Sequence, residues 1–461
     1  MKKVIGLLIL LITLSCAGIS VFAAPEDVPD YIRVGISSGS VGSSYEASSS
    51  DGFAIYQYDG GDITQVESFE DITDIVIKAD EEYINIYPVD EEDQPPVYSY
   101  NNTTKYFVGS TDMEEGIISV SGKSYRGGVM LYKSSASTIR FINVLDPEKY
   151  LYGVLPKEMS SSYPLEALKA QAVAARSFAM GNINRHSSLG YDICNTQCCQ
   201  VYGGVSSEVA KCSSAVNETS GMVAYYAGKP VSCYYSANNG GYIESSKDIW
   251  GTEVGYLQTK KDEYNPEYNW TAEFTTEKLS SILKNAGYSI GTVTGINIKE
   301  KTEGGSVTSL EFVGTDGKAV IGKSKIRSML GSSTVKSLKF TITKSSLSSE
   351  ASPAKAYVKG VSGSATEKIL SGMSVVDKNG NVVILAADSV VAQADTGKST
   401  IQGSAASSGE DGVDGIVLSG KGYGHCIGMS QMGAKAMAEA GFSYDEILKY
   451  YYIGIAWSMF T

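Results

Sequence analysis

The clearest hydrophobic pattern in the chain is a short apolar run that stops at Pro156 and is followed by an Ala-rich segment. The run, residues 150–155, is continuous, and we interpret it as a strand. In the segment after it, Pro164 suits the first position of a helix, and apolar side chains recur at helical spacing up to Met180. The pattern therefore predicts a strand-to-helix connection around Glu158.

Short apolar segments bounded by turn residues predict strands on both sides of this connection. They cover residues 31–36, 54–58, 75–77, 124–132, 139–145, 222–226, 231–235, 293–299 and 307–313. Further helices are expected at residues 215–221 and 276–286, and after the capping box that begins at Ser443. The predicted class is α+β, with mixed strands and short helices around a substrate cleft and a β-rich N-terminal region.

Composition divides the chain into five segments. Residues 1–23 form a signal peptide or signal anchor, residues 24–135 a β-rich N-terminal region, and residues 136–342 the core of the main domain. Residues 343–412 are rich in Ser, Ala and Gly and are interpreted as an insertion or linker, and residues 413–461 return to the main domain.

The N-terminus and the charge balance indicate an exported protein that does not bind nucleic acid. Lys2 and Lys3 precede an apolar stretch, and small residues near Ala23 suit cleavage, although an uncleaved anchor is the alternative. No other segment is long and apolar enough to span a membrane. The formal net charge of −13, without clusters of Lys and Arg, argues against a nucleic-acid partner. The 31 tyrosines suit strands and the polar clefts that carbohydrates occupy.

Glu158 is the candidate catalytic acid. Leu155 and Met159 flank it and can exclude water, which would raise the pKa of its carboxyl group towards general-acid use. The alternative is a solvated carboxylate that interacts favourably with the N-terminus of the following helix.

The densest group of metal-binding residue types is His186 with Cys194, Cys198 and Cys199. One imidazole and three thiolates match a tetrahedral zinc site in type and number. Disulfides are the alternative, because loss of Cys16 with the signal segment would leave six cysteines in an exported protein. Cys212 and Cys233 could then pair with each other or with this group. The sequence leaves both interpretations open.

Two glycine-bearing loops are further candidates for ligand contact. Residues 236–244 combine polar side chains with glycines, which lets a ligand approach the backbone closely. Residues 419–434 carry His425 beside Cys426, and the glycine spacing there is wrong for a dinucleotide fingerprint. A cysteine nucleophile is disfavoured, because neighbours in sequence rarely point at one another.

Together, residues 150–159, 166–177 and 422–434 resemble the stage II sporulation protein D and amidase-enhancer family of bacterial cell-wall proteins. The resemblance is firm over about 145–275 and 415–455, and it makes residues 136–342 and 413–461 a catalytic domain. It implies a lytic transglycosylase that cleaves glycan strands without stem peptides during engulfment in sporulation, with Glu158 as the acid. A single carboxylate suffices if the sugar's C6 hydroxyl replaces water and closes a 1,6-anhydro ring.

The resemblance also bears on the metal and on the last loop. It favours zinc at the His/Cys group, although Cys198 stands where the family pattern commonly has His. The family's Gly-His-Gly is Gly424-His425-Cys426 here, and a side chain at 426 is expected to narrow the loop.

The predicted cleft lies between the Glu158 segment and the loop at 422–431, and peptidoglycan glycan strands are the predicted partner. The candidate substrate-binding residues are Gln171, Arg176, Tyr202, Tyr235, Asn239, His425, Ser430 and Gln431. Arg176 is expected to hold Glu158 or another acid, or to face solvent. Two other functions are open: a non-catalytic enhancer of a cell-wall amidase, and a zinc-dependent wall hydrolase that uses His186 and the cysteines.

Overall fold

The computed structural model describes two compact units of the chain, one built from residues up to Tyr234 and from Met437 onward, the other from Tyr235 to Ala436. Described are residues 29–459 except 102, 104, 348–354, 359–365, 370–373, 377–381, 385–388, 395–396 and 403–412. The expected signal segment, residues 1–23, lies outside the described residues. Helices and strands are mixed in both units, which confirms the α+β class. The five predicted segment boundaries stay predictions. No helix in the described ranges is both long and apolar enough to cross a membrane.

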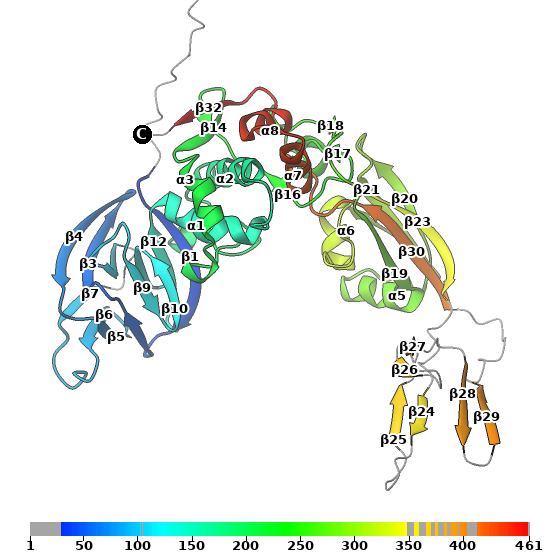
Figure 1. Ribbon diagram of the computed structural model, residues 1–461, viewed down its shortest axis with the longest axis horizontal. Coiled ribbons are helices and arrows are strands. Elements are labelled where there is room, and N and C mark those ends of the chain that lie inside the picture. Colours follow the sequence, from blue (N-terminus) through cyan, green and yellow to red (C-terminus); the bar gives the residue numbers. More distant parts are fainter. Residues whose placement is uncertain are drawn as a thin grey trace, which may run out of the picture. The chain divides into compact units, whose positions relative to one another are not determined.

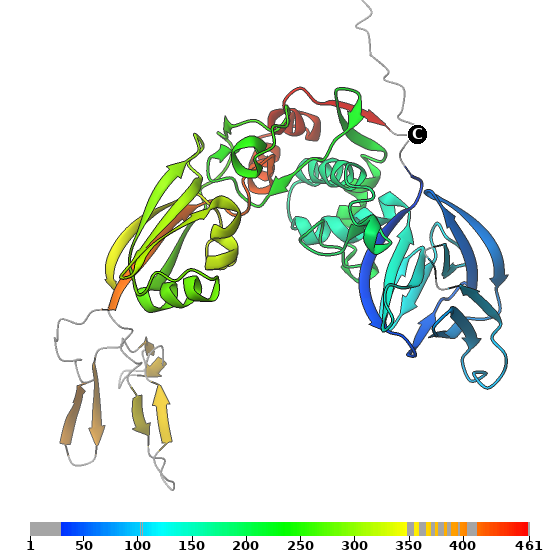
Figure 2. The same cartoon turned by 180° about the vertical axis from the view of Figure 1, so that it is seen from behind.

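Two sheets, antiparallel except for one strand pair, build the β-rich N-terminal region of the first unit (Figures 1 and 2). The first sheet has the order β13 (Ile193–Cys194), β1 (Ile32–Ser40), β12 (Thr138–Leu145), β11 (Gly128–Lys133), β8 (Tyr106–Ser110), β3 (Phe53–Asp59), β4 (Asp62–Phe69), in which only the β1–β13 pair is parallel. The second has the order β10 (Lys123–Arg126), β9 (Ile117–Val120), β2 (Ser44–Ser48), β5 (Asp74–Ala79), β6 (Tyr83–Pro88), β7 (Tyr98–Asn101). The run at 124–132, expected as one strand, is broken by Gly127, whose φ of 72° ends β10 before β11 begins.

The central strands of the first sheet are buried on both faces. On one face, Tyr56, Phe107, Met130 and Ile142 form a core cluster that also includes Tyr191 and Cys194. The neighbouring residues along these strands, such as Ile55 and Leu131, are fully buried on the other face. This explains why the strands are continuous apolar runs without polar alternation. The segment with the His/Cys group is therefore packed on the core of this sheet.

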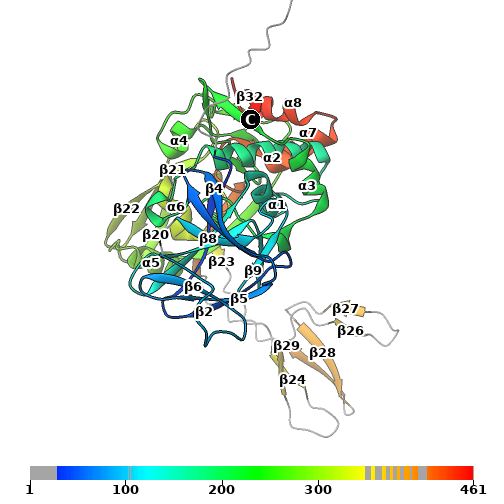
Figure 3. The same ribbon diagram turned by 90° about the vertical axis from the view of Figure 1, so that its left-hand side faces the viewer.

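The helices of the first unit gather around α2 (Leu165–Met180). It contacts α1 (Pro147–Glu158), α3 (Ala210–Asn217), α8 (Tyr444–Tyr451) and β14 (Met222–Tyr226), and Figures 1 and 3 show it beside α8. All its residues except Leu165, Glu166 and Lys169 are buried. Its alanines let neighbours approach closely on every side, so α2 is the core of this helical layer. Two short 3₁₀ turns, η1 (Ser187–Leu189) and η2 (Val205–Ser207), complete the layer.

A small sheet of order β15 (Lys229–Pro230), β14, β32 (Ala456–Met459) closes the first unit. The predicted hairpin at 222–235 is confirmed at its turn but not in its length. Ala227 and Gly228 both have positive φ, which is typical of a two-residue hairpin turn, and the return strand ends at Pro230.

The second unit contains two three-stranded antiparallel sheets and three short helices. Helix α5 contacts strands of both sheets, and α6 contacts the second. The sheets have the orders β19 (Asn269–Thr275), β30 (Val413–Lys421), β23 (Phe340–Leu347) and β20 (Val293–Lys301), β21 (Val307–Gly314), β22 (Gly317–Gly322); the helices are α4 (Ser246–Trp250), α5 (Thr276–Asn285) and α6 (Lys323–Leu330).

Short strand pairs and one helix complete the part of the chain that the structure describes. The parallel pair β16 (Tyr235–Ser236) and β31 (Met429–Ser430) and the antiparallel pair β17 (Tyr242–Ile243) and β18 (Lys260–Lys261) lie in the second unit; α7 (Gln431–Glu439) spans the boundary between the units in sequence. Within the expected insertion at 343–412, the described residues form the pairs β24 (Lys355–Val358) with β25 (Thr366–Ile369), β26 (Ser374–Val376) with β27 (Val382–Ile384), and β28 (Ser389–Ala394) with β29 (Gly397–Gln402).

Candidate active site

Glu158 is the last residue of helix α1, which corrects the prediction of a strand ahead of it. Asp146 caps the helix by accepting hydrogen bonds from the backbone N–H groups of Glu148 and Lys149, and Pro147 occupies the first turn. A short apolar run does not distinguish a buried helix from a buried strand, and here the N-cap formed by Asp146 favours the helix. The acid therefore lies on a helix-to-helix connection, at the C-terminal end of α1.

The carboxyl group of Glu158 is half-buried and accepts a hydrogen bond from the backbone N–H of Val201, with 3.1 Å between N and Oε1. Burial raises its pKa, and the Val201 N–H opposes this increase in part. No charged neighbour contributes to the shift. The flanking Leu155 and Met159 are buried, as expected. Glu158 is thus a carboxyl group whose pKa is raised by burial and not by a charged neighbour.

The segment that carries Val201 is anchored to the fold on both sides of this hydrogen bond. The amide of Gln200 accepts from the Tyr150 hydroxyl and donates to the Ala175 carbonyl. Tyr202 donates its hydroxyl to Asn143, at 2.9 Å, and its ring lies over Gly153, where a Cβ would come within 2.6 Å of the ring. Only a glycine at 153 leaves room for this ring, so α1 positions both Glu158 and the segment that binds it.

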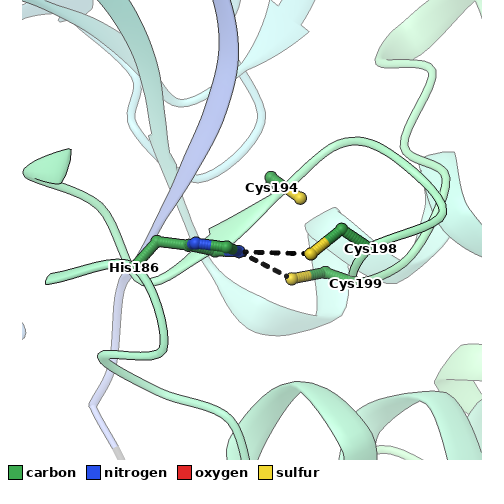
Figure 4. Close-up of side chains that lie close together, drawn as sticks. All are labelled: His186, Cys194, Cys198 and Cys199. Atoms are coloured by element: carbon green, nitrogen blue, oxygen red, sulfur yellow. Dashed lines mark hydrogen bonds between the residues drawn. The ribbon is translucent and has the colours of Figure 1, made fainter. Parts of the chain in front are cut away.

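His186 and the three cysteines come together in the first unit, as Figure 4 shows. One ligand atom from each lies within 4.8 Å of all the others. The Nε2 atom of His186 is 3.2 Å from Cys199 Sγ and 3.9 Å from Cys198 Sγ. Adjacent cysteines can both face the imidazole here because the chain turns between Thr196 and Cys199.

The cysteines in the described part of the chain are all free thiols, including Cys212, Cys233 and Cys426, which are buried elsewhere. The disulfide alternative therefore finds no support in this structure. The His/Cys group fits a zinc ion in the chemistry of its donors and in their mutual approach, and four protein ligands would close the shell.

Arg176 does not hold Glu158. Its side chain is fully buried and forms a bidentate ion pair with Glu148, with Nε–Oε1 at 2.6 Å and Nη2–Oε2 at 2.5 Å. It also donates to the carbonyls of Val216 and Met222, both at 3.2 Å. The expectation of another acid as its partner is confirmed, and the arginine fastens α1 and α3 to α2.

The predicted sugar contacts in the second unit gather where the loops at 236–244 and 422–431 meet. Asn238 and Tyr423 exchange two backbone hydrogen bonds, and Tyr235 pairs with Met429 in β16 and β31. Asn239 donates to Asp262 at 2.5 Å, and Ser430 donates to Asn265 at 2.7 Å. Sequence reasoning missed Asp262 and Asn265, because nothing in their local sequence marks them as partners of loops so far away in the chain.

Burial separates the predicted substrate-binding residues into two groups. Tyr235 and His425 are half-buried, and Gln431 is 8% exposed. Burial lowers the pKa of His425 to about 4, so its ring is neutral near pH 7. Gln431 is buried, and so are the five other candidates, whose side chains are 0–6% exposed: Gln171, Arg176, Tyr202, Asn239 and Ser430. Contact with a sugar stays a prediction for all eight residues. The cleft shared by Glu158 and the loop at 422–431 also stays a prediction, because the two belong to different units.

Comparison with known proteins places this sequence in a family. The family model described as stage II sporulation protein matches residues 135–226, which include Glu158 and the His/Cys group. An amidase enhancer of Bacillus subtilis (strain 168) is 33% identical over 315 residues, which cover 66% of this chain and 39% of that protein. The chain belongs to the stage II sporulation protein D and amidase-enhancer family.

Two more relatives of this family member extend the match. Stage II sporulation protein D of the same Bacillus subtilis strain is 26% identical over 71% of this chain and 77% of that protein. An uncharacterized protein of Brachyspira hyodysenteriae is 30% identical over 74% of the chain and 76% of that protein. Residues 251–363, in the second unit, match a separate domain of unknown function.

This family member departs from the expected Gly-His-Gly loop at Cys426, and the structure gives the reason for a glycine there. Cys426 has a φ of 63°, in the left-handed region that favours glycine. Its side chain is 1% exposed, with Sγ 3.8 Å from the Asn238 carbonyl oxygen. The thiol is therefore directed into the fold, which corrects the expectation that it narrows the loop.

Proposed function

We propose that the chain is an exported lytic transglycosylase that cleaves peptidoglycan glycan strands, those without stem peptides in particular, during sporulation-linked wall remodelling. The observation that carries the proposal is Glu158, a lone half-buried carboxyl group whose pKa is raised by burial. Membership of the family, with relatives named for sporulation and for amidase enhancement, supports a role at the cell wall.

In this mechanism the Glu158 carboxyl group first donates its proton to the glycosidic oxygen as the C1–O bond breaks. The resulting carboxylate then accepts the proton of the C6 hydroxyl on the same sugar, whose oxygen bonds to C1 and closes a 1,6-anhydro ring. Water is not consumed, so no second carboxylate is needed to activate it. The Val201 N–H, 3.1 Å from Oε1, orients the carboxyl group and stabilises its ionised form between the two transfers.

Zinc is proposed as a structural ion at the His/Cys group. His186, Cys194, Cys198 and Cys199 would hold it, and the ion would cross-link the segment that ends in Val201. A closed shell of four protein ligands leaves no position for a reactive water, which argues against the zinc-dependent hydrolase.

The decisive experiment is mass spectrometry of the products formed from glycan strands without stem peptides. Wild-type protein is expected to release 1,6-anhydro ends, and Glu158→Gln to abolish cleavage while retaining binding. Glu114→Gln makes the same change at an exposed carboxylate and should cleave normally. Reducing ends in place of anhydro ends would mean that water attacks, and normal cleavage by Glu158→Gln would remove the glutamate from this role.

A second candidate function is a non-catalytic protein that binds the wall and stimulates an amidase. The relative named amidase enhancer favours it. Absence of cleavage by the wild-type protein, together with retained glycan binding and a faster partner amidase, would support this function.

A further inference from the structure

A cavity of about 560 Å³ lies in the second unit, in the part that includes the domain of unknown function. This volume is in the range of small-ligand sites. The cavity follows the sheet β19–β30–β23 at the position where Trp270, Gly420 and Phe340 lie directly opposite one another on three strands. The Trp270 ring occupies the space over Gly420, where a Cβ would come within 2.2 Å of it. The glycine therefore shapes this wall.

The lining of the cavity is basic, in a chain whose net charge is −13. Lys301, Lys339 and Lys421 line it, and none of the lining residues is acidic. Lys339 is neutralised by the buried Glu244, with 3.1 Å between Nζ and Oε1. Lys301 and Lys421 are exposed and have no acidic partner in the described structure, and Lys301 Nζ donates only to the Phe340 carbonyl. Two positive charges remain available to an anionic ligand.

The lining also holds an unsatisfied donor. Trp270 is 5% exposed, and among the described residues its indole Nε1–H has no hydrogen-bond partner. Because this nitrogen atom is itself enclosed, it offers no hydrogen bond to a ligand in the cavity, and the Trp270 side chain contributes an apolar wall. Gly240, from the loop at 236–244, and Gly304 also line the cavity and bring backbone close to a ligand.

An aromatic pair continues from the cavity along the same strands. Asn269 and Lys421 are paired in the sheet, and the Gly422 N–H donates to the Tyr268 carbonyl immediately beyond them. The rings of Tyr268 and Tyr423 lie 6.0 Å apart, and Tyr423 is 39% exposed. Tyr268 is half-buried, and Lys336 Nζ lies 5.1 and 5.8 Å from the centroids of the Tyr268 and Tyr423 rings and donates to the Tyr268 hydroxyl. The exposed Tyr423 ring offers an apolar face and a hydroxyl group, a combination that suits a sugar.

We propose that the cavity and the Tyr268–Tyr423 pair form a second glycan-binding site that recognises an acidic sugar, with Lys301 and Lys421 pairing with its carboxylate. The inference rests on the proposed function. Muramic acid carries a lactyl carboxyl group that forms an amide with the stem peptide, and removal of that peptide leaves a free carboxylate, ionised near pH 7. The two lysines would thus select strands that have lost their peptides.

The test measures binding by the full chain in a Glu158→Gln background, so that no strand is cleaved. The ligands are glycan strands without stem peptides, strands that retain them, and neutral oligomers of N-acetylglucosamine. The double variant Lys301→Met/Lys421→Met should bind the first ligand about tenfold more weakly, as expected for the loss of two exposed ion pairs. It should bind the other two within about twofold of the parent.

Lys318→Met is the matched control, because Lys318 is an exposed lysine of the same unit that does not line the cavity. It should leave binding of all three ligands unchanged, and thermal unfolding should confirm that each variant is folded. Unchanged binding of peptide-free strands by the double variant would overturn the proposal. So would equal losses for all three ligands, or equally tight binding of the neutral oligomers by the parent. Product analysis of the wild-type protein tests the proposed function separately, so the two failures are distinguishable.

Discussion

Arg176 gives the sharpest contrast between a substrate contact and a structural residue, because the sequence suggests the first and the structure the second. Replacing it with Met removes both hydrogen bonds to Glu148, at 2.6 and 2.5 Å, and two to backbone carbonyls, both at 3.2 Å. Loss of one partner of a buried ion pair typically costs about 3–5 kcal/mol of the free energy of unfolding. Glu148 is 16% exposed and keeps the Gly221 N–H as a donor, so we expect the lower end of that range.

The assay must report on the first unit by itself, because two compact units need not unfold together. Hydrogen exchange of the buried α2 amides under native conditions provides this local measure. The matched control is Arg185→Met, which removes an exposed arginine bonded to Asn182 and should cost less than about 1 kcal/mol. The double variant Glu148→Met/Arg176→Met removes both charges and should recover part of the loss.

A direct role in substrate binding would give a different result. If Arg176→Met left the α2 amides as protected as Arg185→Met does, yet weakened binding of glycan strands, the structural interpretation would be refuted. Equal destabilisation by the single and double variants would contradict the ion-pair reasoning, since the cost would then arise from lost packing alone.

Two further predictions concern the His/Cys group and the ionisation of Glu158. Metal analysis should find about one zinc ion per chain, and the double variant Cys198→Ser/Cys199→Ser should lose it; full metal content in that variant would count against the site. Because the ion would hold the segment that ends in Val201, removal of zinc by a chelator should speed hydrogen exchange of the Val201 amide. Since burial raises the folded-state pKa of Glu158, its contribution to stability is fully present below the unfolded-state pKa and is lost as pH rises through the folded-state value. Glu158→Gln should therefore raise the melting temperature more at pH 7 than at pH 4. An equal effect on the melting temperature at both pH values would contradict the raised pKa. Cleavage by the wild-type protein should fall as pH rises from 4 to 7.

Elements with strong local signals could be predicted from the sequence. Helix α2 begins and ends within a residue of its expected bounds, α5 matches its expected range closely, and the capping box at Ser443 is formed with Glu446. The apolar run at 150–155 predicts a strand where helix α1 lies, because the run is short. The helix N-terminus signal, Asp146 followed by Pro147, comes before the run. Helix α3 begins earlier than expected for a similar reason, since no side chain caps its start.

The residues of the candidate site were easier to predict than the partners that hold them in place. The residue types and close spacing of His186 and the cysteines were sufficient to suggest a cluster, which the fold then assembles. The partner of Glu158 is a backbone N–H, and every residue but proline offers one, so no sequence pattern marks Val201. The partner of Arg176, Glu148, lies 28 residues away on another helix, where only the packing of α1 on α2 brings it into reach.

The path from Cys194 to Tyr202 explains how the His/Cys group and Glu158 can depend on each other without direct contact. The His/Cys group fixes one end of this path, and the bonds of Gln200 and Tyr202 fix the other. Val201 lies beside this second anchor and contributes a main-chain donor, so the position of the donor depends on the two anchors more than on the Val201 side chain. If the group holds zinc, exchange of Cys198 for a histidine that still binds the ion would preserve the anchor and with it the burial that raises the pKa of Glu158.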